Sequence, residues 1–108
     1  MEEQIYHYHA EMCKVLSHPK RLELIGMLRD EEMKAGELSQ RLGLTPSNLS
    51  QHLAIMRERR ILASRKEGNE VYYRIANPKL LQAFDILREI LFEQIRQDAA
   101  LIQGARLR

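Results

Sequence analysis

The chain of 108 residues contains a single cysteine, no tryptophan and few aromatic side chains. One cysteine excludes an intrachain disulfide and therefore a redox switch between two cysteines of one chain. The lack of a disulfide also favours a location in the reducing cytoplasm. No apolar run approaches the roughly 20 residues that a membrane-spanning helix needs. The N-terminus, MEEQIYHYHAEM, is acidic and lacks the basic-then-apolar layout of a signal peptide. These absences predict a small cytoplasmic protein with no membrane partner.

Sequence patterns that carry catalysis are also missing. We find no nucleophile beside a base, no phosphate-binding loop and no HExxH-like motif. The sequence therefore predicts neither an enzyme nor a bound cofactor.

Positive charge is modest overall, with a net charge of +2, but it is unevenly distributed. Residues 41–74 hold seven Lys/Arg against three Asp/Glu, whereas residues 1–40 hold five against eight. A local basic excess is expected of a surface that contacts phosphates. An ordinary solvated surface gives a similar excess, so charge alone leaves both interpretations open.

Helical periodicity begins near the N-terminus. Apolar residues from Ile5 to Leu16 recur at helical spacing, and Pro19 suits the first position of a second helix that runs to about Asp30. Leu22 is expected to face inward on this second helix. Met33-Lys34 is long enough for a short strand that would pair with a later hairpin.

A last helix is predicted to begin at Asn77-Pro78 and to end near Ala100, with a frayed tail over residues 103–108. Its apolar face is wider than a helix on the rim of a small domain needs. Pairing with a second copy of the chain would bury the excess. We therefore interpret residues 1–16 and 78–100 as dimerisation helices.

The middle of the chain, residues 35–59, has the spacing of a helix-turn-helix. A short helix over Ala35–Leu42 is followed by Gly43, which suits the left-handed residue at a helix end. Thr45 can cap the next helix and Pro46 can open it. That helix, to about Arg59, buries a stripe of Leu49, Leu53 and Met56 and is polar on the opposite side of its first two turns.

Residues 62–76 read as a β-hairpin. Leu62–Lys66 and Glu70–Ile75 are short strand-like runs, and Glu67-Gly68-Asn69 supplies residues that accept the positive φ of a turn. The predicted fold is therefore mainly α with a small β-hairpin. It is a winged helix-turn-helix in one domain, residues 1–108, with five or six helices and a two- to three-stranded wing.

Three segments together resemble the ArsR/SmtB family of bacterial winged-helix repressors, namely KVLSHPKRLELIGML, GELSQRLGLTPSNLSQHLAIMR and EGNEVYYRI. The resemblance covers about residues 10–92. It implies a homodimer, built from the first and last helices, that sits on a twofold-symmetric operator in double-stranded DNA and releases it on a signal. Two departures are His18, where the family usually has an acidic cap, and Arg60, where a glycine usually precedes the wing.

DNA reading is expected from the exposed front of the helix over residues 46–59. Asn48 and Gln51 carry amides that pair bidentately with adenine, and the Ser47 hydroxyl suits several base edges. Thr45 and Ser50 are better placed for phosphates. Further candidates for backbone or wing contacts are His52, Arg57, Arg59, Arg65, Lys66, Asn69 and Arg74. Two alternatives stay open: Ser47 and Asn48 only stabilise the helix start, and His52, which flanks the buried stripe, acts as a sensor rather than in the favoured structural or phosphate-bonding role.

The residues of two familiar metal sites of the family are absent. One site places thiolates in a C-x-C-D pattern, where this chain has Lys34, Gly36 and Glu37, and no side chain here replaces the thiolates. The other uses acids and histidines of the last helix, and residues 78–108 contain no histidine. The sequence therefore predicts no resident metal and leaves the small inducer unidentified.

Cys13 is the remaining candidate for a sensor. His9 and Cys13 lie at i, i+4 on one helix face, with His7 nearby. Zinc needs about four ligands, so His18, Glu11 or a second subunit would have to complete a site. Cys13 as a small buried hydrophobe is the favoured interpretation, and metal binding and thiol redox chemistry are the alternatives.

The sequence thus predicts a DNA-binding transcriptional repressor that an unidentified signal releases. The alternatives are a metal- or redox-responsive regulator that uses Cys13 with His9 or His7, and a winged-helix protein-interaction module without DNA binding. A protein-binding version should expose apolar residues on the helix over residues 46–59, and this helix is polar there.

Overall fold

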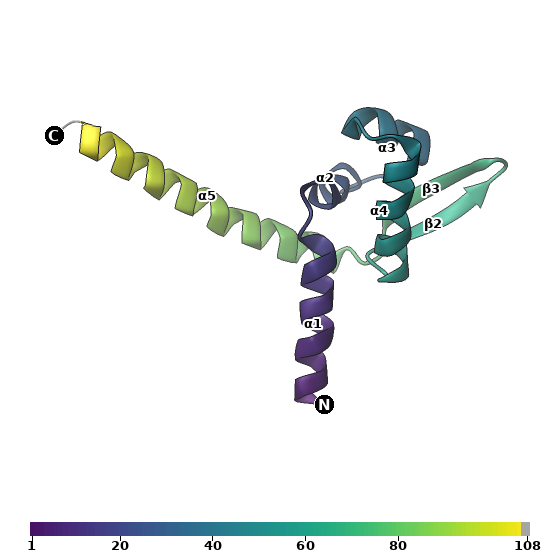
Figure 1. The fold of residues 1–108 in the computed structure, drawn as a ribbon, viewed down its shortest axis with the longest axis horizontal. Coiled ribbons are helices and arrows are strands. Elements are labelled where there is room, and N and C mark those ends of the chain that lie inside the picture. The colour runs from purple at the N-terminus through teal and green to yellow at the C-terminus, as the bar shows by residue number, and fades with distance from the viewer. Residues whose placement is uncertain (107–108) are drawn as a thin grey trace. The chain divides into compact units, whose positions relative to one another are not determined.

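The computed structural model describes residues 1–106 of the chain. Along this part the chain forms five helices and three strands. In chain order they are α1 (Glu2–Leu16), α2 (Pro19–Met27), β1 (Met33–Lys34), α3 (Ala35–Leu42), α4 (Pro46–Glu58), β2 (Leu62–Glu67), β3 (Glu70–Ile75) and α5 (Lys79–Arg106). Figure 1 draws the helices and the β2–β3 hairpin in order along the chain. The predicted winged helix-turn-helix, mainly α with a small hairpin, is confirmed.

The chain divides into two compact units. Residues 1–77 hold α1 to α4 and the sheet, and the unit from Pro78 onward consists of α5. The helix-turn-helix and the wing therefore lie within the first unit. The roles of α1 and α5 in dimerisation stay predictions.

Side-chain caps fix where two of the helices begin. The Nδ1 atom of His18 accepts the Lys20 N–H at 3.2 Å and so caps α2, in the position where the family usually has an acid. The Oγ1 atom of Thr45 accepts the Asn48 N–H at 3.2 Å and caps α4, as predicted. Such caps satisfy amides that have no partner inside the helix.

Two helix ends differ from the prediction. The second helix ends at Met27 rather than near Asp30, because the acidic run that follows would oppose the negative end of the helix dipole. The last helix continues to Arg106, past the expected end at Ala100, so its described residues beyond 102 are helical rather than frayed. Residues 107–108 of the predicted tail lie outside the described residues.

The three strands form an antiparallel sheet in the order β1-β3-β2. The short strand predicted at Met33-Lys34 is confirmed, and Met33 lies opposite Tyr73. The hairpin turns at Gly68, whose φ is 63°. Because glycine adopts such a φ without steric cost, the turn forms where the sequence indicated.

The hydrophobic core lies within residues 1–77 and draws on α1 to α4, the segment before β2, and the sheet. Leu22 was expected to face inward but is 37 % exposed. The stripe of α4 is buried as predicted. In the part of the chain that the structure describes, the buried apolar side chains are those of Val15, Leu24, Ile25, Leu28, Met33, Leu38, Leu42, Leu49, Leu53, Met56, Ile61, Leu62 and Ile75. Among the described residues, no helix combines the length and apolar character that crossing a membrane requires.

Candidate nucleic-acid interface

The turn between α3 and α4 is held by several hydrogen bonds. Gly43 takes the left-handed conformation, with φ 65° and ψ 31°, and ends α3. The Ser39 carbonyl accepts the Leu44 N–H at 3.2 Å, and the Ser39 hydroxyl donates to the Leu44 carbonyl at 2.5 Å. Lys20 of α2 donates from Nζ to the last carbonyl of α3, that of Leu42, at 3.1 Å. These bonds fix the angle at which α4 leaves the turn.

The first two turns of α4 present a polar surface. Leu49 and Leu53 are buried beneath it, which orients the helix. The side chains nominated from the sequence are exposed on this surface, namely Ser47, Asn48, Ser50 and Gln51. No acidic side chain occurs on α4 before Glu58, so nothing on this front repels phosphate.

His52 lies between α4 and α2 and is half-buried. Its Nδ1 atom accepts a hydrogen bond from Arg21 Nε at 3.0 Å, and Arg21 Nη1 also donates to the carbonyl of Val15, at the end of α1, at 3.0 Å. The ring of His18 packs edge-on against His52, with centroids 4.6 Å apart. Burial lowers the pKa of His52, and the positive charges of His18 and Arg21 lower it further. These contacts are consistent with a structural role for His52, and its contact with phosphate stays a prediction.

The C-terminal end of α4 directs two nominated arginines at other parts of the same unit. Arg57 Nη1 donates to the Ser64 hydroxyl of β2 at 3.4 Å. Arg59 Nη2 lies 3.6 Å from the Glu11 carboxylate of α1. Both arginines remain exposed, so these contacts orient α4 without removing the charges from solvent.

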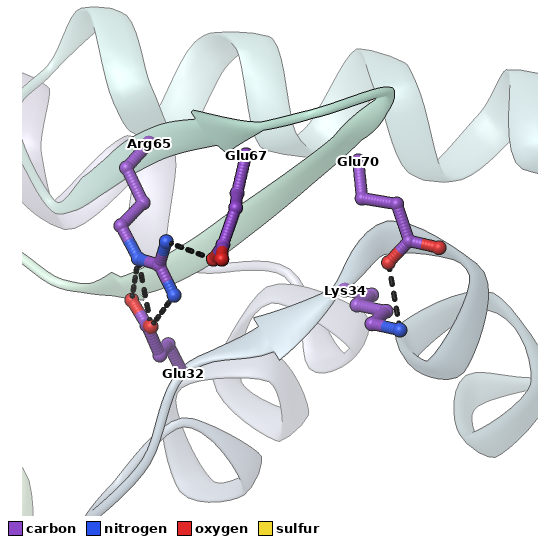
Figure 2. Close-up of polar contacts among 5 residues, drawn as sticks. All are labelled: Glu32, Lys34, Arg65, Glu67 and Glu70. Carbon is purple, nitrogen blue, oxygen red and sulfur yellow. Dashed lines mark hydrogen bonds and ion pairs between the residues drawn. The ribbon is translucent and has the colours of Figure 1, made fainter.

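Two nominated basic residues of the wing, Arg65 and Arg74, lie beside acids. Arg65 Nε donates to the two carboxylate oxygens of Glu32 at 2.8 and 3.0 Å, and Nη2 donates to the same carboxylate. Its Nη1 donates to Glu67 Oε2 at 2.6 Å, as Figure 2 shows. The hydrogen bond from Arg65 lowers the pKa of Glu32, and Arg74 lowers it further.

Lys66 and Asn69 lie differently. Both are exposed, with Lys66 near the end of β2 and Asn69 in the turn between β2 and β3. Within the described part of the chain, Lys66 forms no ion pair. Both side chains are therefore open toward a ligand near the hairpin tip.

Cys13 is exposed, so the interpretation of Cys13 as a buried core residue is wrong for a single chain. The reason is that α1 contributes only Val15 to the core. Nor do His7, His9 and Cys13 form a metal site, since the described residues contain no cluster of three or more His, Cys, Asp or Glu side chains that could hold a metal. A role for the Cys13 thiol therefore requires a group from outside this chain.

The structure also contains connections that the sequence did not suggest. Glu32, Lys20 and Arg21 each tie two or three elements together, and none belongs to a recognisable motif. Glu32 and Arg65 are 33 positions apart, so periodicity, which reports only local neighbours, gives no signal for this pair.

Comparison with known proteins agrees with this geometry. The model of the family described as bacterial regulatory protein, arsR family, matches residues 18–64. An uncharacterized HTH-type transcriptional regulator of Mycobacterium tuberculosis, Rv0081, is 33 % identical over 105 residues, which cover 96 % of this chain and 92 % of the relative. This chain belongs to the ArsR family. It is accordingly a DNA-binding transcriptional regulator and not an enzyme.

Other members extend this ArsR-family likeness. The biofilm growth-associated repressor of Xylella fastidiosa is 36 % identical over 82 % of this chain and 77 % of its own. The crystal structure of Rv0081 matches with a TM-score of 0.82 at 32 % identity and covers 88 % of this chain and 96 % of that one. The structure of HlyU of Vibrio cholerae, named a transcriptional activator, matches with a TM-score of 0.74 at 33 % identity. The match covers 82 % of this chain and 96 % of that one.

Proposed function

We propose that this regulator is a homodimeric repressor that binds a twofold-symmetric operator through α4 and releases it on a signal. The observation that carries the proposal is the exposed polar front of α4, held at a fixed angle by the Gly43 turn and by the Thr45 cap. A helix held in this way can enter the major groove, with its N-terminal residues nearest the base edges.

Base reading falls to the amides of Asn48 and Gln51, with Ser47 beside them. Each good bidentate pair between an amide and adenine discriminates by about 1–3 kcal/mol. Ser50 and the hydroxyl of Thr45 lie at the edge of this front, where they suit phosphate oxygens. Phosphate contacts set the register of the protein on the duplex without reading its sequence.

The wing contacts the flanking backbone through its tip. Lys66 and Asn69 are exposed there and free to approach phosphate. A lysine contact to phosphate adds affinity that is nearly independent of sequence and falls as salt rises. The wing therefore strengthens binding while α4 selects the site.

The dimer is supported by exposed apolar side chains on α1 and α5. On α5, Leu87, Ile90 and Leu91 are 58 %, 46 % and 47 % exposed in the single chain. Apolar surface of this extent marks an interaction site, and two copies on a twofold axis match a symmetric operator. The inducer would act by biasing the arrangement of the dimer rather than by blocking the DNA face.

Repression is the direction of control that the resemblance implies and the one carried by the name of the X. fastidiosa relative. HlyU, whose name describes an activator, shows that related chains act in both directions. In vitro transcription from a promoter that contains the bound sequence decides between them, because a repressor lowers the transcript and an activator raises it.

The operator can be obtained by enrichment of duplexes from a randomised pool with the full chain. We expect the enriched sequence to be an inverted repeat. Replacement of Asn48 or Gln51 by Ala should then weaken binding to it by about 5- to 150-fold, which corresponds to about 1–3 kcal/mol. Fluorescence anisotropy at fixed salt measures this change.

Gln82→Ala provides the matched control, because it removes an exposed amide from α5 instead of α4. It should leave affinity unchanged. The same variants should bind an unrelated duplex as the parent chain does, since non-specific binding rests on phosphate contacts. The repressor proposal is wrong if no sequence is enriched. It is also wrong if the dissociation constant for every duplex stays at roughly 10⁻⁴–10⁻⁶ M, the range of non-specific binding.

A further inference from the structure

The register of the sheet separates the basic residues of the wing into two faces. Residues that lie directly opposite each other in antiparallel strands point to the same face, and neighbours along a strand point to opposite faces. Arg65 lies opposite Tyr72, and Lys66 lies opposite Val71. Arg65 and Lys66 therefore point away from each other, although they are adjacent in sequence.

The face that holds Lys66 is the one that α4 covers. Ser64 shares this face, and Arg57 of α4 donates to its hydroxyl. Lys66 is two residues further along β2, near the hairpin tip, where it is exposed. It therefore lies on the same side of the wing as the helix that reads DNA.

The opposite face, here called the outer face, carries several side chains of opposite charge that pair with one another. Lys34 Nζ lies 2.7 Å from Glu70 Oε2, and the Arg65 guanidinium stacks on Tyr72 with 4.4 Å between Cζ and the ring centroid. Figure 2 shows Arg65 between Glu32 and Glu67, with the Lys34–Glu70 pair beside them. By register, the residues of this face are Lys34, Ala63, Arg65, Glu67, Glu70, Tyr72 and Arg74.

This pairing resolves a repulsion that the hairpin would otherwise contain. Glu67 and Glu70 are directly opposite each other across the turn, and like charges in that position destabilise a strand pair. Arg65 bonds Glu67, and Lys34 bonds Glu70, so the two carboxylates are held by different cations. Arg65 and Lys34 thus stabilise the hairpin by offsetting the repulsion between Glu67 and Glu70.

Arg65 is poorly suited to bind phosphate in this arrangement. All three of its nitrogens donate to carboxylates, two of them in a fork to Glu32. The single guanidinium charge is thus shared between two carboxylates, which reduces its attraction for an approaching anion. Glu32 precedes β1, so the fork ties β2, the first strand of the hairpin, to a separate part of the fold.

We propose that Arg65 is a positioning residue rather than a DNA contact: through Glu32 and Glu67 it sets the orientation of the wing and neutralises the acids beside its tip. Lys66 and Asn69 are then the wing residues that meet phosphate. This inference rests on the proposed contact of the wing with DNA.

The test measures the affinity of the full chain for its enriched duplex over a range of salt concentrations. Glu32→Gln should weaken binding by about fivefold or more, although it removes a negative charge. Arg65→Lys should weaken binding similarly, because lysine keeps the charge but cannot form the fork. Neither variant should change the slope of log affinity against log salt, since no phosphate contact is lost.

Lys66→Gln is the matched control, one position away on the other face. It should reduce the magnitude of the slope by about 0.9 for each wing. In a double-mutant cycle, Glu67→Gln should recover part of the affinity lost in Arg65→Gln, because it removes an acid left unpaired, but it should not recover the salt slope lost in Lys66→Gln. Thermal unfolding of each variant confirms that the fold is retained.

Three outcomes would overturn the proposal: tighter binding by Glu32→Gln, parent-like binding by Arg65→Lys, or a reduced salt slope for Arg65→Gln. Each would assign Arg65 to phosphate. If Lys66→Gln leaves the slope unchanged while Glu32→Gln still weakens binding, the wing's phosphate contact is wrong and the positioning role stands. The two failures are therefore distinguishable.

Discussion

At the scale of single residues, Arg60 has the most unusual backbone. Its φ is 60°, and it is the only non-glycine residue with a positive φ in the described part of the chain. The left-handed conformation costs an ordinary L-residue about 1–2 kcal/mol because Cβ crowds the neighbouring carbonyl. The family usually has glycine at this position, which adopts a positive φ without this cost. Arginine therefore strains the backbone here, and it adds a charge next to the DNA-binding elements.

Replacement of Arg60 by Gly should raise the free energy of unfolding by about 1 kcal/mol, because it relieves the strain of a positive φ. Urea denaturation near neutral pH measures the change. Arg60→Ala serves as the control, since it removes the charge but keeps Cβ and should not stabilise the chain. Equal stabilisation by both substitutions would assign the effect to charge and contradict this account.

At the scale of elements, His52 joins α4 to the rest of the unit. It accepts a hydrogen bond from Arg21, which also bonds the end of α1. The neutral ring is needed, because a protonated Nδ1 cannot accept. Burial and the adjacent positive charges lower the pKa of His52 from its usual 6.5, which favours that neutral form.

This lowered pKa gives the stability a defined pH dependence. Below about pH 6.5 the unfolded chain protonates His52, whereas the folded chain does so only at a lower pH. The contribution of His52 is therefore fully present above pH 6.5 and is lost as the pH falls toward the lowered pKa. His52→Asn, whose carbonyl oxygen can still accept from Arg21, should lack this part of the pH dependence.

Urea denaturation of both chains between pH 7.5 and 5.5 measures the difference. Near pH 7.5, where His52 and its Asn replacement are both neutral, the free energies of unfolding of the two chains should change with pH in nearly the same way. Below pH 6.5 the free energy of unfolding of the parent chain should fall more steeply. Parallel curves over the whole range would show that His52 does not contribute.

The elements that could be predicted from the sequence are those with local causes. Gly43, the cap at Thr45 and the hairpin turn at Gly68 each depend on residues within a few positions, and the structure has them where expected. The pairing of Glu32 with Arg65 and of Arg21 with His52 depends on residues more than 30 positions apart. The sequence therefore nominated Arg65 as a basic wing residue without indicating that two acids already bind it.

At the scale of the whole molecule, each of the two units exposes apolar surface. In the first unit, Ile5, Tyr6 and Tyr8 of α1 are more than half exposed. In the second, α5 exposes apolar residues along its length, among them Ile86, Leu87 and Phe92. Cys13, also on α1, is exposed as well, because α1 contributes only Val15 to the core. A partner that covers α1 and α5 would explain why so much apolar surface is carried by helices that contribute so little to the core.

A second copy of the chain is the partner that the proposed repressor requires, and Leu91 tests it. Leu91 is 47 % exposed, and Leu87 and Ile95 flank it at helical spacing. Burial of a leucine contributes about 2 kcal/mol. Leu91→Glu removes this contribution from two subunits and should weaken self-association by about 100- to 1,000-fold. Sedimentation equilibrium measures the change.

Gln82→Glu introduces the same charge on the opposite side of α5 and should leave the dimer intact. Because a dimer contacts two half-sites at once, the parent chain should prefer an inverted repeat over a single half-site by far more than Leu91→Glu does. Both chains should bind the single half-site comparably, since α4 and the wing are unaltered. If Leu91→Glu remains dimeric and keeps the preference, α5 does not form the interface, and the exposed residues of α1 become the place to seek it.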